Sequence, residues 1–384
     1  MKKNVLLKRT LKSSIFKIAT IINKFIPKDD GIVLLYSANK GGIQFSLVPL
    51  RDYMIEHDFH KRYRIVCGVE NLNDRDNAPL EFVDWIGAYK LFFRAKHVFY
   101  SAGQIPIKPS KNQCVIHLRH GNVNFKKAGK LTKINNGDEF FFTYMAASAP
   151  YFKSVMAKEY GCSEDNIAVV GDPLIDQLFK NIPDKYAFSE YKKVILWLPT
   201  FRQSDYLGYD DSSLENLVPL FEEVDYPQLN ELLKKHNIKL IVKLHPSQKN
   251  FKGGKRHFSH FDIYTHSEFL DNNYDVNEMM IRADSLIGDY SSASMQYLIL
   301  DRPQAFVVPD IMEYAEKRGF VFDNPEDYMG GHIIKTIDQF NRFIYDISSD
   351  KDIYKEKRHR VCNAVYMYQD NKNCQRIVEL SGMK

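Results

Sequence analysis

Cysteine is scarce in this sequence, and long apolar runs are absent from it. The five cysteines are scattered over 384 residues, and no two of them form a CxxC pair. An odd and dispersed set argues against a disulfide framework and against a structural zinc site, and it indicates a reducing compartment. No apolar stretch approaches the roughly 20 residues that a membrane-spanning helix needs.

Other signatures are missing as well. The net charge of +5 is modest for a chain of this length, and we find no nucleic-acid-binding motif, so no nucleic-acid partner is predicted. The sequence has no Walker lysine, no GxGxxG and no GxSxG motif. His257, His260 and His266 lie close together without a known ligand spacing, and we predict neither a metal nor a cofactor.

The first acidic residue is Asp29, and eight lysines and arginines precede it. Apolar side chains recur at helical spacing in the same stretch: Leu7, Leu11, Ile15, Ile18, Ile22 and Phe25. This pattern predicts that residues 1–28 form a basic amphipathic helix on an anionic membrane surface. The alternative is a helix that packs on the protein body with a solvated basic face. A secretory signal is not expected, because no small-residue cleavage site follows.

Short β-branched runs that end in a polar or glycine-containing break recur along the chain. They lie at 31–42, 97–104, 114–122, 167–176, 194–202, 238–247, 285–292 and 304–310. Helical stretches such as 227–237 and 294–301 alternate with them, which predicts parallel sheets. We expect two doubly wound, Rossmann-like α/β domains over 29–182 and 183–384, with the last helix free to pack back on the first domain. Ligands of such domains bind at the carboxyl ends of the strands.

His120 and Gly121 follow one of these strands directly, and Lys126 and Lys127 come soon after. A histidine there can accept a proton near neutral pH, and the glycine lets the backbone approach a ligand. The lysines suit an anionic partner. A capping histidine followed by a solvated basic turn is the competing interpretation.

Basic and hydroxyl groups stand at further strand ends. Lys243 and His245 end one strand, and the imidazole could donate to a phosphate oxygen, although a structural histidine is an equal alternative. Thr200 and Arg202 follow another strand and could hold a phosphate or a base. Arg318 stands next to a glycine in the same half of the chain.

The stretch "ADSLIGDYSSASMQ" at 283–296 combines a strand, a break at Gly288 and the start of a helix. Ser291, Ser292 or Ser294 could cap that helix, and Asp289 could cap or orient its first turn. The free N–H groups and the positive dipole end of the same helix would attract a phosphate. Both a simple cap and a phosphate cradle explain these residue types.

The motifs "HGNVNFKKAG", "VILWLPTFR", "IVKLHPS" and "ADSLIGDYSS" occur in the order seen in the CDP-glycerol glycerophosphotransferase family. The resemblance spans about residues 30 to 345. It implies a glycosyltransferase-B-like fold with the donor bound mainly in the C-terminal half. It further implies transfer of glycerol phosphate or ribitol phosphate from a CDP-linked donor to a hydroxyl of a lipid-linked saccharide or growing polymer.

The resemblance also assigns roles to residues of this chain. The family's two histidines fall on His120 and His245, and its serine motif, which holds the donor diphosphate, falls on Ser291 and Ser292. His120 would be the base for the acceptor hydroxyl. His245, the helix terminus and Arg318 would stabilise charge on the phosphate.

The remaining expected contacts divide between the two substrates. The donor-side set is Thr200, Arg202, Lys243, Gly288, Asp289, Ser291, Ser292, Gln296 and Arg318. The acceptor-side set is Gly121, Asn122, Lys126 and Lys127. The expected location is the cytoplasmic face of the bacterial membrane, as a peripheral protein.

Two departures from the family pattern bear on substrate choice. Asn122, Val123 and Asn124 replace the usual Thr-Pro-Leu with one extra residue before the lysines, and Gln296 stands where relatives commonly have an aspartate. A glycosyltransferase that uses a CMP- or UDP-sugar is the alternative function, and a non-catalytic assembly protein is a third. The choice between glycerol and ribitol, the acceptor, the number of units added and self-association stay open.

Overall fold

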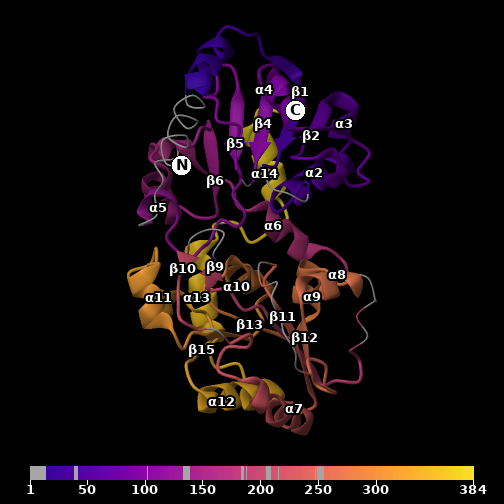
Figure 1. Ribbon diagram of the computed structural model, residues 1–384, viewed down its shortest axis with the longest axis vertical. Coiled ribbons are helices and arrows are strands. Elements are labelled where there is room, and N and C mark those ends of the chain that lie inside the picture. The colour runs from indigo at the N-terminus through magenta and orange to yellow at the C-terminus, as the bar shows by residue number, and fades with distance from the viewer. Residues whose placement is uncertain are drawn as a thin grey trace, which may run out of the picture. The chain divides into compact units, whose positions relative to one another are not determined.

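A computed structural model describes residues 14–38, 42–101, 103–132, 139–182, 186, 188–204, 209–214, 216–246, 248 and 255–384 (Figure 1). The chain forms two compact units. Unit 1 comprises Met1–Asn122, Gly129–Gln177 and Met367–Lys384, and unit 2 comprises Val123–Ala128 and Leu178–Tyr366. The main division falls after Gln177, where a boundary at 182/183 was expected, and residues 367–384, expected as free to pack on the first domain, are grouped with unit 1.

Unit 1 is built on a parallel seven-stranded sheet of order β3-β2-β1-β4-β5-β6-β7. In that order the strands are β3 (Glu81–Val83), β2 (Arg64–Gly68), β1 (Asp29–Tyr36), β4 (Ala95–Tyr100), β5 (Cys114–His117), β6 (Tyr144–Ala147) and β7 (Ile167–Val169). The helices are α2 (Leu47–Glu56), α3 (Phe59–Arg62), α4 (Trp85–Phe92), α5 (Phe152–Tyr160), α6 (Pro173–Asp176) and α14 (Asn373–Leu380).

The central strand β1 is apolar throughout its second half because both faces of the sheet are covered. Val33 and Leu35 point into a cluster with residues of α2 and the C-terminal helix α14. Ile32 and Leu34 point into a second cluster with residues of α4. Successive side chains of a strand face opposite sides, so this alternation places helices on both faces.

Unit 2 contains a parallel six-stranded sheet of order β12-β11-β8-β13-β14-β15. These strands are β12 (Phe261–Tyr264), β11 (Ile238–Lys243), β8 (Lys193–Trp197), β13 (Ser285–Gly288), β14 (Gln304–Val307) and β15 (His332–Ile334), and β9 (Gln203–Ser204) pairs with β10 (Tyr209–Asp210). The helices are α7 (Tyr226–Lys235), α8 (His266–Asp271), α9 (Val276–Arg282), α10 (Ser292–Gln296), α11 (Ile311–Lys317), α12 (Ile337–Ser348) and α13 (Lys355–Val365).

Strand order reverses between β8 and β13 of unit 2, because the chain moves outward from β8 to β12 and then returns to β13. Such a reversal opens a crevice at the carboxyl ends of the two central strands, where doubly wound domains bind ligands. Trp197, the last residue of β8, is buried in the unit 2 core against Phe340 of α12. The residues after Trp197 and after Gly288 therefore emerge side by side at this crevice.

Both units are α/β domains with a parallel sheet, which confirms this part of the predicted fold class. Each of the eight predicted strand segments overlaps an observed strand, whereas β2, β3, β6, β9, β10, β12 and β15 were not predicted.

The N-terminal helix is described only in part. Residues 14–23 are helical, and Leu7, Leu11 and the basic residues up to Lys12 lie outside the described residues. Ile15, Ile18, Ile22 and Phe25 are exposed, while Phe16 packs against the cluster beneath α4. The basic amphipathic helix over 1–28 stays a prediction. Within the described ranges, no helix is long and apolar enough to cross a bilayer.

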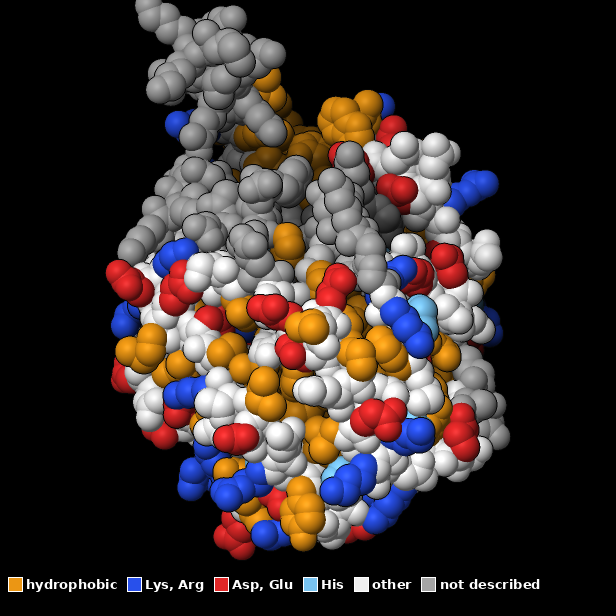
Figure 2. Space-filling model, turned by 60° about the horizontal axis from the view of Figure 1, so that its bottom comes forward, with side chains coloured by type: hydrophobic (Ala, Val, Ile, Leu, Met, Phe, Trp, Pro, Cys, Tyr) orange, Lys and Arg blue, Asp and Glu red, His pale blue; other side chains and the backbone are white. Residues whose placement is uncertain are grey.

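The surface shown in Figure 2 carries acidic and basic side chains interspersed with single apolar ones. Among the side chains coloured there, no large area of one sign stands out.

Candidate functional site

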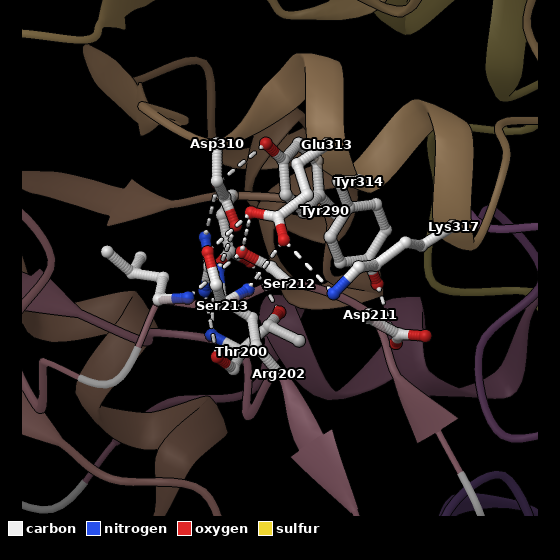
Figure 3. Close-up of polar contacts among 12 residues, drawn as sticks. Thr200, Arg202, Asp211, Ser212, Ser213, Tyr290, Asp310, Glu313, Tyr314 and Lys317 are labelled. Atoms are coloured by element: carbon white, nitrogen blue, oxygen red, sulfur yellow. Dashed lines mark hydrogen bonds and ion pairs between the residues drawn. The ribbon is translucent and has the colours of Figure 1, made fainter.

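The crevice of unit 2 contains a buried ionic network that starts at Asp289, the residue after β13. Its carboxylate accepts hydrogen bonds from the Thr200 backbone N–H (2.7 Å), the Thr200 hydroxyl (2.5 Å) and Nη1 of Arg202 (2.9 Å). Figure 3 shows Thr200 and Arg202, from the loop that follows β8, beside Tyr290, which follows β13. Asp289 and Arg202 are both buried, so each charge depends on the other for compensation.

Asp310, which follows β14, holds the other edge of the same guanidinium. Nε of Arg202 donates to Asp310 at 2.7 Å, and the Tyr290 hydroxyl donates to Asp310 at 3.0 Å. Burial opposes the charge of Arg202, but Asp289 and Asp310 outweigh it and raise the pKa of the guanidinium. Burial also raises the pKa of Tyr290, which stays a hydrogen-bond donor. The network thus ties the exits of β8, β13 and β14 together.

A second set of contacts fixes the segment after β10 to helix α11. Glu313 accepts hydrogen bonds from the Ser213 backbone N–H (3.0 Å) and the Ser213 hydroxyl (2.8 Å), and it pairs with Lys317 at 3.0 Å (Figure 3). The Tyr314 hydroxyl donates to Asp211 at 3.3 Å. The loop that follows the β9–β10 pair is therefore held against one side of the crevice.

His245 lies beyond β11, and its ring stacks in parallel on Phe201 with the centroids 6.1 Å apart. The side chain is exposed, but neighbouring protein removes part of its hydration. This desolvation, together with the positive charges of Lys126 and Lys243, lowers the pKa of His245 to about 4. The imidazole is therefore neutral near pH 7 and can donate one N–H to a ligand.

Lys243 is the last residue of β11. The side chain is buried, its ammonium donates to the Leu244 carbonyl at 3.2 Å, and it lies 5.8 Å from the centre of the Phe269 ring. Burial lowers the pKa of Lys243 to about 8. These contacts hold the Lys243 side chain inside unit 2, where its charge acts on His245.

Helix α10 begins close against the end of β13. A Cβ atom on Gly288 would lie 2.0 Å from Oγ of Ser294, so the glycine lets the helix approach the strand end. Ser291 occupies the N-cap position without a side-chain cap bond, and its hydroxyl lies 3.2 Å from that of Ser294. Asp289 does not cap this helix, because Thr200 and Arg202 occupy its carboxylate.

A cavity of about 310 Å³ adjoins the network on the β8 side. Thr200, Phe201, Asn216 and Gln248 contribute to its lining. This volume lies at the lower end of the range typical of small-molecule sites. The cavity therefore adds room for part of a ligand beside the exit of β8.

The predicted base His120 stands on a sharp loop of unit 1. Arg119 before it has φ +63°, uncommon for a residue with a side chain, and Gly121 after it has φ +116°. The Arg119 carbonyl accepts from the Ser101 hydroxyl at 2.8 Å, and the buried Arg119 guanidinium lies 3.3 Å from Glu159. The His120 side chain is exposed, with its ring 5.7 Å from that of Phe45. The loop is thus fixed on both sides of a presented histidine.

Asp172 anchors the same loop, a role that no pattern in the sequence indicated. Its buried carboxylate accepts from the backbone N–H groups of Asn122 (2.9 Å) and Leu174 (3.1 Å) and from the Ser46 hydroxyl (3.3 Å). Burial raises the pKa of Asp172 to about 6 despite these donors. Asn122 itself is buried and donates to the Gly171 carbonyl at 2.9 Å, so it supports the loop from inside.

The other predicted site residues divide between the units as follows. Lys126 and Lys127 belong to unit 2 with the donor-side set, and not to the unit that carries His120. Arg318 lies at the end of α11 with Nη1 3.7 Å from Asp211. Gln296 is buried at the end of α10. Asp310 was missed, although its position directly after a predicted strand was a usable signal.

Two doubly wound domains, one with a polar crevice at its switch point, define this chain as a Rossmann-like protein of the glycosyltransferase-B-like class. The wall teichoic acid polymerase TagF shares this fold with a TM-score of 0.71, at 21% identity over 99% of this chain and 95% of that chain. The family model for CDP-Glycerol:Poly(glycerophosphate) glycerophosphotransferase matches residues 18–380. The chain belongs to this family, as the resemblance predicted.

Similar relatives include two polymerases of Staphylococcus aureus (strain NCTC 8325 / PS 47). The teichoic acid ribitol-phosphate polymerase TarK is 27% identical over 66% of this chain and 47% of the relative. The teichoic acid ribitol-phosphate polymerase TarL is 25% identical over 95% of this chain and 65% of the relative. The chain thus spans about half to two thirds of the length of these relatives.

Proposed function

We propose that the protein transfers a polyol phosphate, glycerol phosphate or ribitol phosphate, from its CDP-linked form to a hydroxyl of a lipid-linked saccharide or a growing teichoic acid or capsule polymer. The observation that carries the proposal is the polar crevice at the switch point of unit 2, in a chain whose family match covers residues 18–380. TarK and TarL are ribitol-phosphate polymerases, and a TagF variant was solved after a soak with CDPG. The likeness to these proteins supports a CDP-linked donor for this chain.

On the acceptor side, His120 takes the proton of the attacking hydroxyl. A bond forms between that oxygen and phosphorus, while the bond from phosphorus to the bridging oxygen breaks and CMP leaves with its electron pair. The loop around His120 is held by Asp172 and Ser101, so the imidazole is presented without a large reorganisation.

On the donor side, His245, Ser291 and Ser292 contact the phosphates. The N-cap position of α10 has no side-chain cap bond, which leaves its first N–H groups to a phosphate. Arg202, Thr200 and Asp289 bond to one another and position the two loops. Because a bound phosphate carries negative charge, donor binding raises the pKa of His245 from about 4 and strengthens its hydrogen bond.

The decisive experiment incubates the purified chain with CDP-glycerol or CDP-ribitol and a lipid-linked acceptor, and measures CMP release. We expect His120→Ala and His245→Ala each to lower the rate by at least about 100-fold, since proton transfer and charge stabilisation each contribute that much. His57→Ala is the matched control, because His57 is exposed and its ring contacts Tyr53 of the adjoining helix α2.

Full activity of either test variant contradicts the assigned role. Thermal shift with CDP-glycerol, CDP-ribitol, CMP-sialic acid and UDP-sugars separates the polyol donor from the sugar donors. A thermal shift with a sugar nucleotide alone contradicts the proposal and favours the alternative function, a glycosyltransferase that uses a CMP- or UDP-sugar. Gln296→Asp in the same panel tests whether this position selects between glycerol and ribitol.

We further propose that unit 1 docks on the anionic cytoplasmic face of the bacterial membrane, as a peripheral protein. Ile15, Ile18 and Ile22 present an exposed apolar face on the N-terminal helix, and Phe25, just beyond its end, is exposed as well. Trp85 at the start of α4 is half exposed and contacts Tyr89, which also contacts Phe16 of that helix. Apolar and aromatic side chains beside basic ones suit the interface of an anionic bilayer.

A further inference from the structure

The segment Val123–Ala128 leaves unit 1 only a few residues after His120 and becomes an integral part of unit 2. The Lys127 backbone N–H donates to the Gly319 carbonyl at 3.1 Å, and the Val321 N–H donates to the Phe125 carbonyl at 2.8 Å. Lys126 forms an antiparallel bridge with Phe320 between these two bonds. The segment is therefore paired like an added strand along residues 319–321.

Packing fixes the direction of the side chains in this segment. Phe125 is fully buried and packs edge-on against Phe306 of β14, at 6.1 Å, and Phe322, at 5.3 Å. The stem of Lys127 lies against Gly319, where a Cβ atom would meet its Cδ at 3.1 Å. Because neighbouring side chains of an extended segment alternate, Lys126 projects to the opposite side.

That opposite side is the crevice of unit 2. Phe320, the backbone partner of Lys126, packs on Tyr290 of the ionic network at 5.3 Å. The charges that act on the Lys126 ammonium are those of Asp289, Arg318, Asp211 and Arg202, and Lys126 in turn acts on His245. Lys126 thus lies among the residues that follow β8, β11 and β13.

The acids of this crevice already have other partners. Asp289 binds Thr200 and Arg202, Asp310 binds Arg202 and Tyr290, and Asp211 accepts from Tyr314. Among the residues that the structure describes, none forms a hydrogen bond or an ion pair with the Lys126 ammonium. Burial is the main cause that lowers the pKa of this ammonium to about 8. A partly desolvated cation without an acidic partner is compensated best by an anionic ligand.

We infer that Lys126 binds the diphosphate of the donor from within unit 2, and does not serve the acceptor. The inference rests on the proposed function, which supplies the diphosphate. It separates two adjacent lysines by role, because Lys126 projects into the crevice while Lys127 lies along Gly319. It also places a donor contact six residues after the proposed base His120 in the chain.

The test measures binding of CDP-glycerol, CDP-ribitol and cytidine to the full chain by calorimetry, without acceptor. Lys126→Met removes the charge and keeps the length of the side chain, and Lys127→Met is the matched control. We expect Lys126→Met to weaken binding of the CDP-polyol about 10- to 100-fold, the loss typical of a charge-assisted bond, and to leave cytidine binding unchanged. Lys127→Met should stay within about twofold of the unsubstituted chain, and Lys126→Arg should retain part of the affinity.

Equal affinity of Lys126→Met and the unsubstituted chain for the CDP-polyol overturns the inference. A parallel loss of cytidine binding also overturns it, because the lysine would then act through the fold. If the unsubstituted chain binds neither CDP-polyol, the proposed function itself fails, and the inference fails with it.

Discussion

At the scale of single residues, Asp172 combines burial with a position next to the proposed base. Its pKa of about 6 in the folded chain lies above the ordinary value of 3.8. The folded state therefore binds more protons than the unfolded state between these values, and the contribution of Asp172 to stability falls as pH rises from about 4 to 6. A shift of about two pKa units corresponds to about 3 kcal/mol.

Asp172→Asn removes this titration. The measured quantity is the difference in the free energy of unfolding between the unsubstituted chain and the variant. We expect this difference to decrease by about 3 kcal/mol from pH 4 to pH 7, because the unsubstituted chain alone loses the contribution of Asp172. Urea titrations at both pH values measure the difference, in which the other titrating groups cancel. Ser46→Ala is the control, because it removes one donor to the carboxylate and keeps the ionisable group. Parallel pH profiles for Asp172→Asn and the unsubstituted chain would rule out the raised pKa.

At the scale of helices and strands, the exposed face of the N-terminal helix carries the membrane proposal. Removing residues 1–28 is a poor test, because Asn23 donates to the Lys108 carbonyl and Lys28 donates to the Phe93 carbonyl inside unit 1. Two substitutions on the exposed face, Ile18→Asp and Ile22→Asp, leave those bonds in place. Each replaces an exposed apolar side chain with an acid of the same sign as the lipid.

We expect the double variant to bind anionic vesicles containing phosphatidylglycerol at least about tenfold more weakly in a sedimentation assay, because apolar burial is lost and repulsion is added. Ile353→Asp is the control, an equally exposed isoleucine in unit 2. Unchanged vesicle binding by the double variant would contradict the membrane proposal and show that the helix only packs on unit 1.

The strands also show which parts of the fold could be predicted from the sequence alone. Long β-branched runs such as the one that forms β11 were predictable, because both faces of a central parallel strand are buried. β3 and β15 were not, since each joins one polar residue to only two apolar ones, whereas β7, of equal length, continues into an apolar run that ends at Val170. The sequence placed polar residues at strand ends, but the bond between Arg202 and Asp289 depends on β8 lying next to β13, which strand order decides. The pairing of 123–128 with residues 319–321 left no local signal.

At the scale of the whole molecule, the chain crosses between the units four times, after Asn122, Ala128, Gln177 and Tyr366. Neither unit is therefore a continuous piece of sequence. Helix α14 supplies Cys374, Ile377 and Val378 to the core beneath β1, and Asn373 donates to Asp176 at 2.6 Å. A fragment of residues 1–182, cut at the boundary that the sequence suggested, loses all of these contacts.

The apolar side chains of α14 are worth about 5 kcal/mol or more in buried surface, at about 2 kcal/mol each for the larger ones. That is comparable to the whole stability of an ordinary domain. We therefore expect fragment 1–182 to show no cooperative thermal transition by circular dichroism. Residues 1–177 joined by a flexible glycine-serine linker to 367–384 should recover one, because the linker restores α14 to its core. Cooperative unfolding of fragment 1–182 by itself would show that the C-terminal helix is dispensable to unit 1.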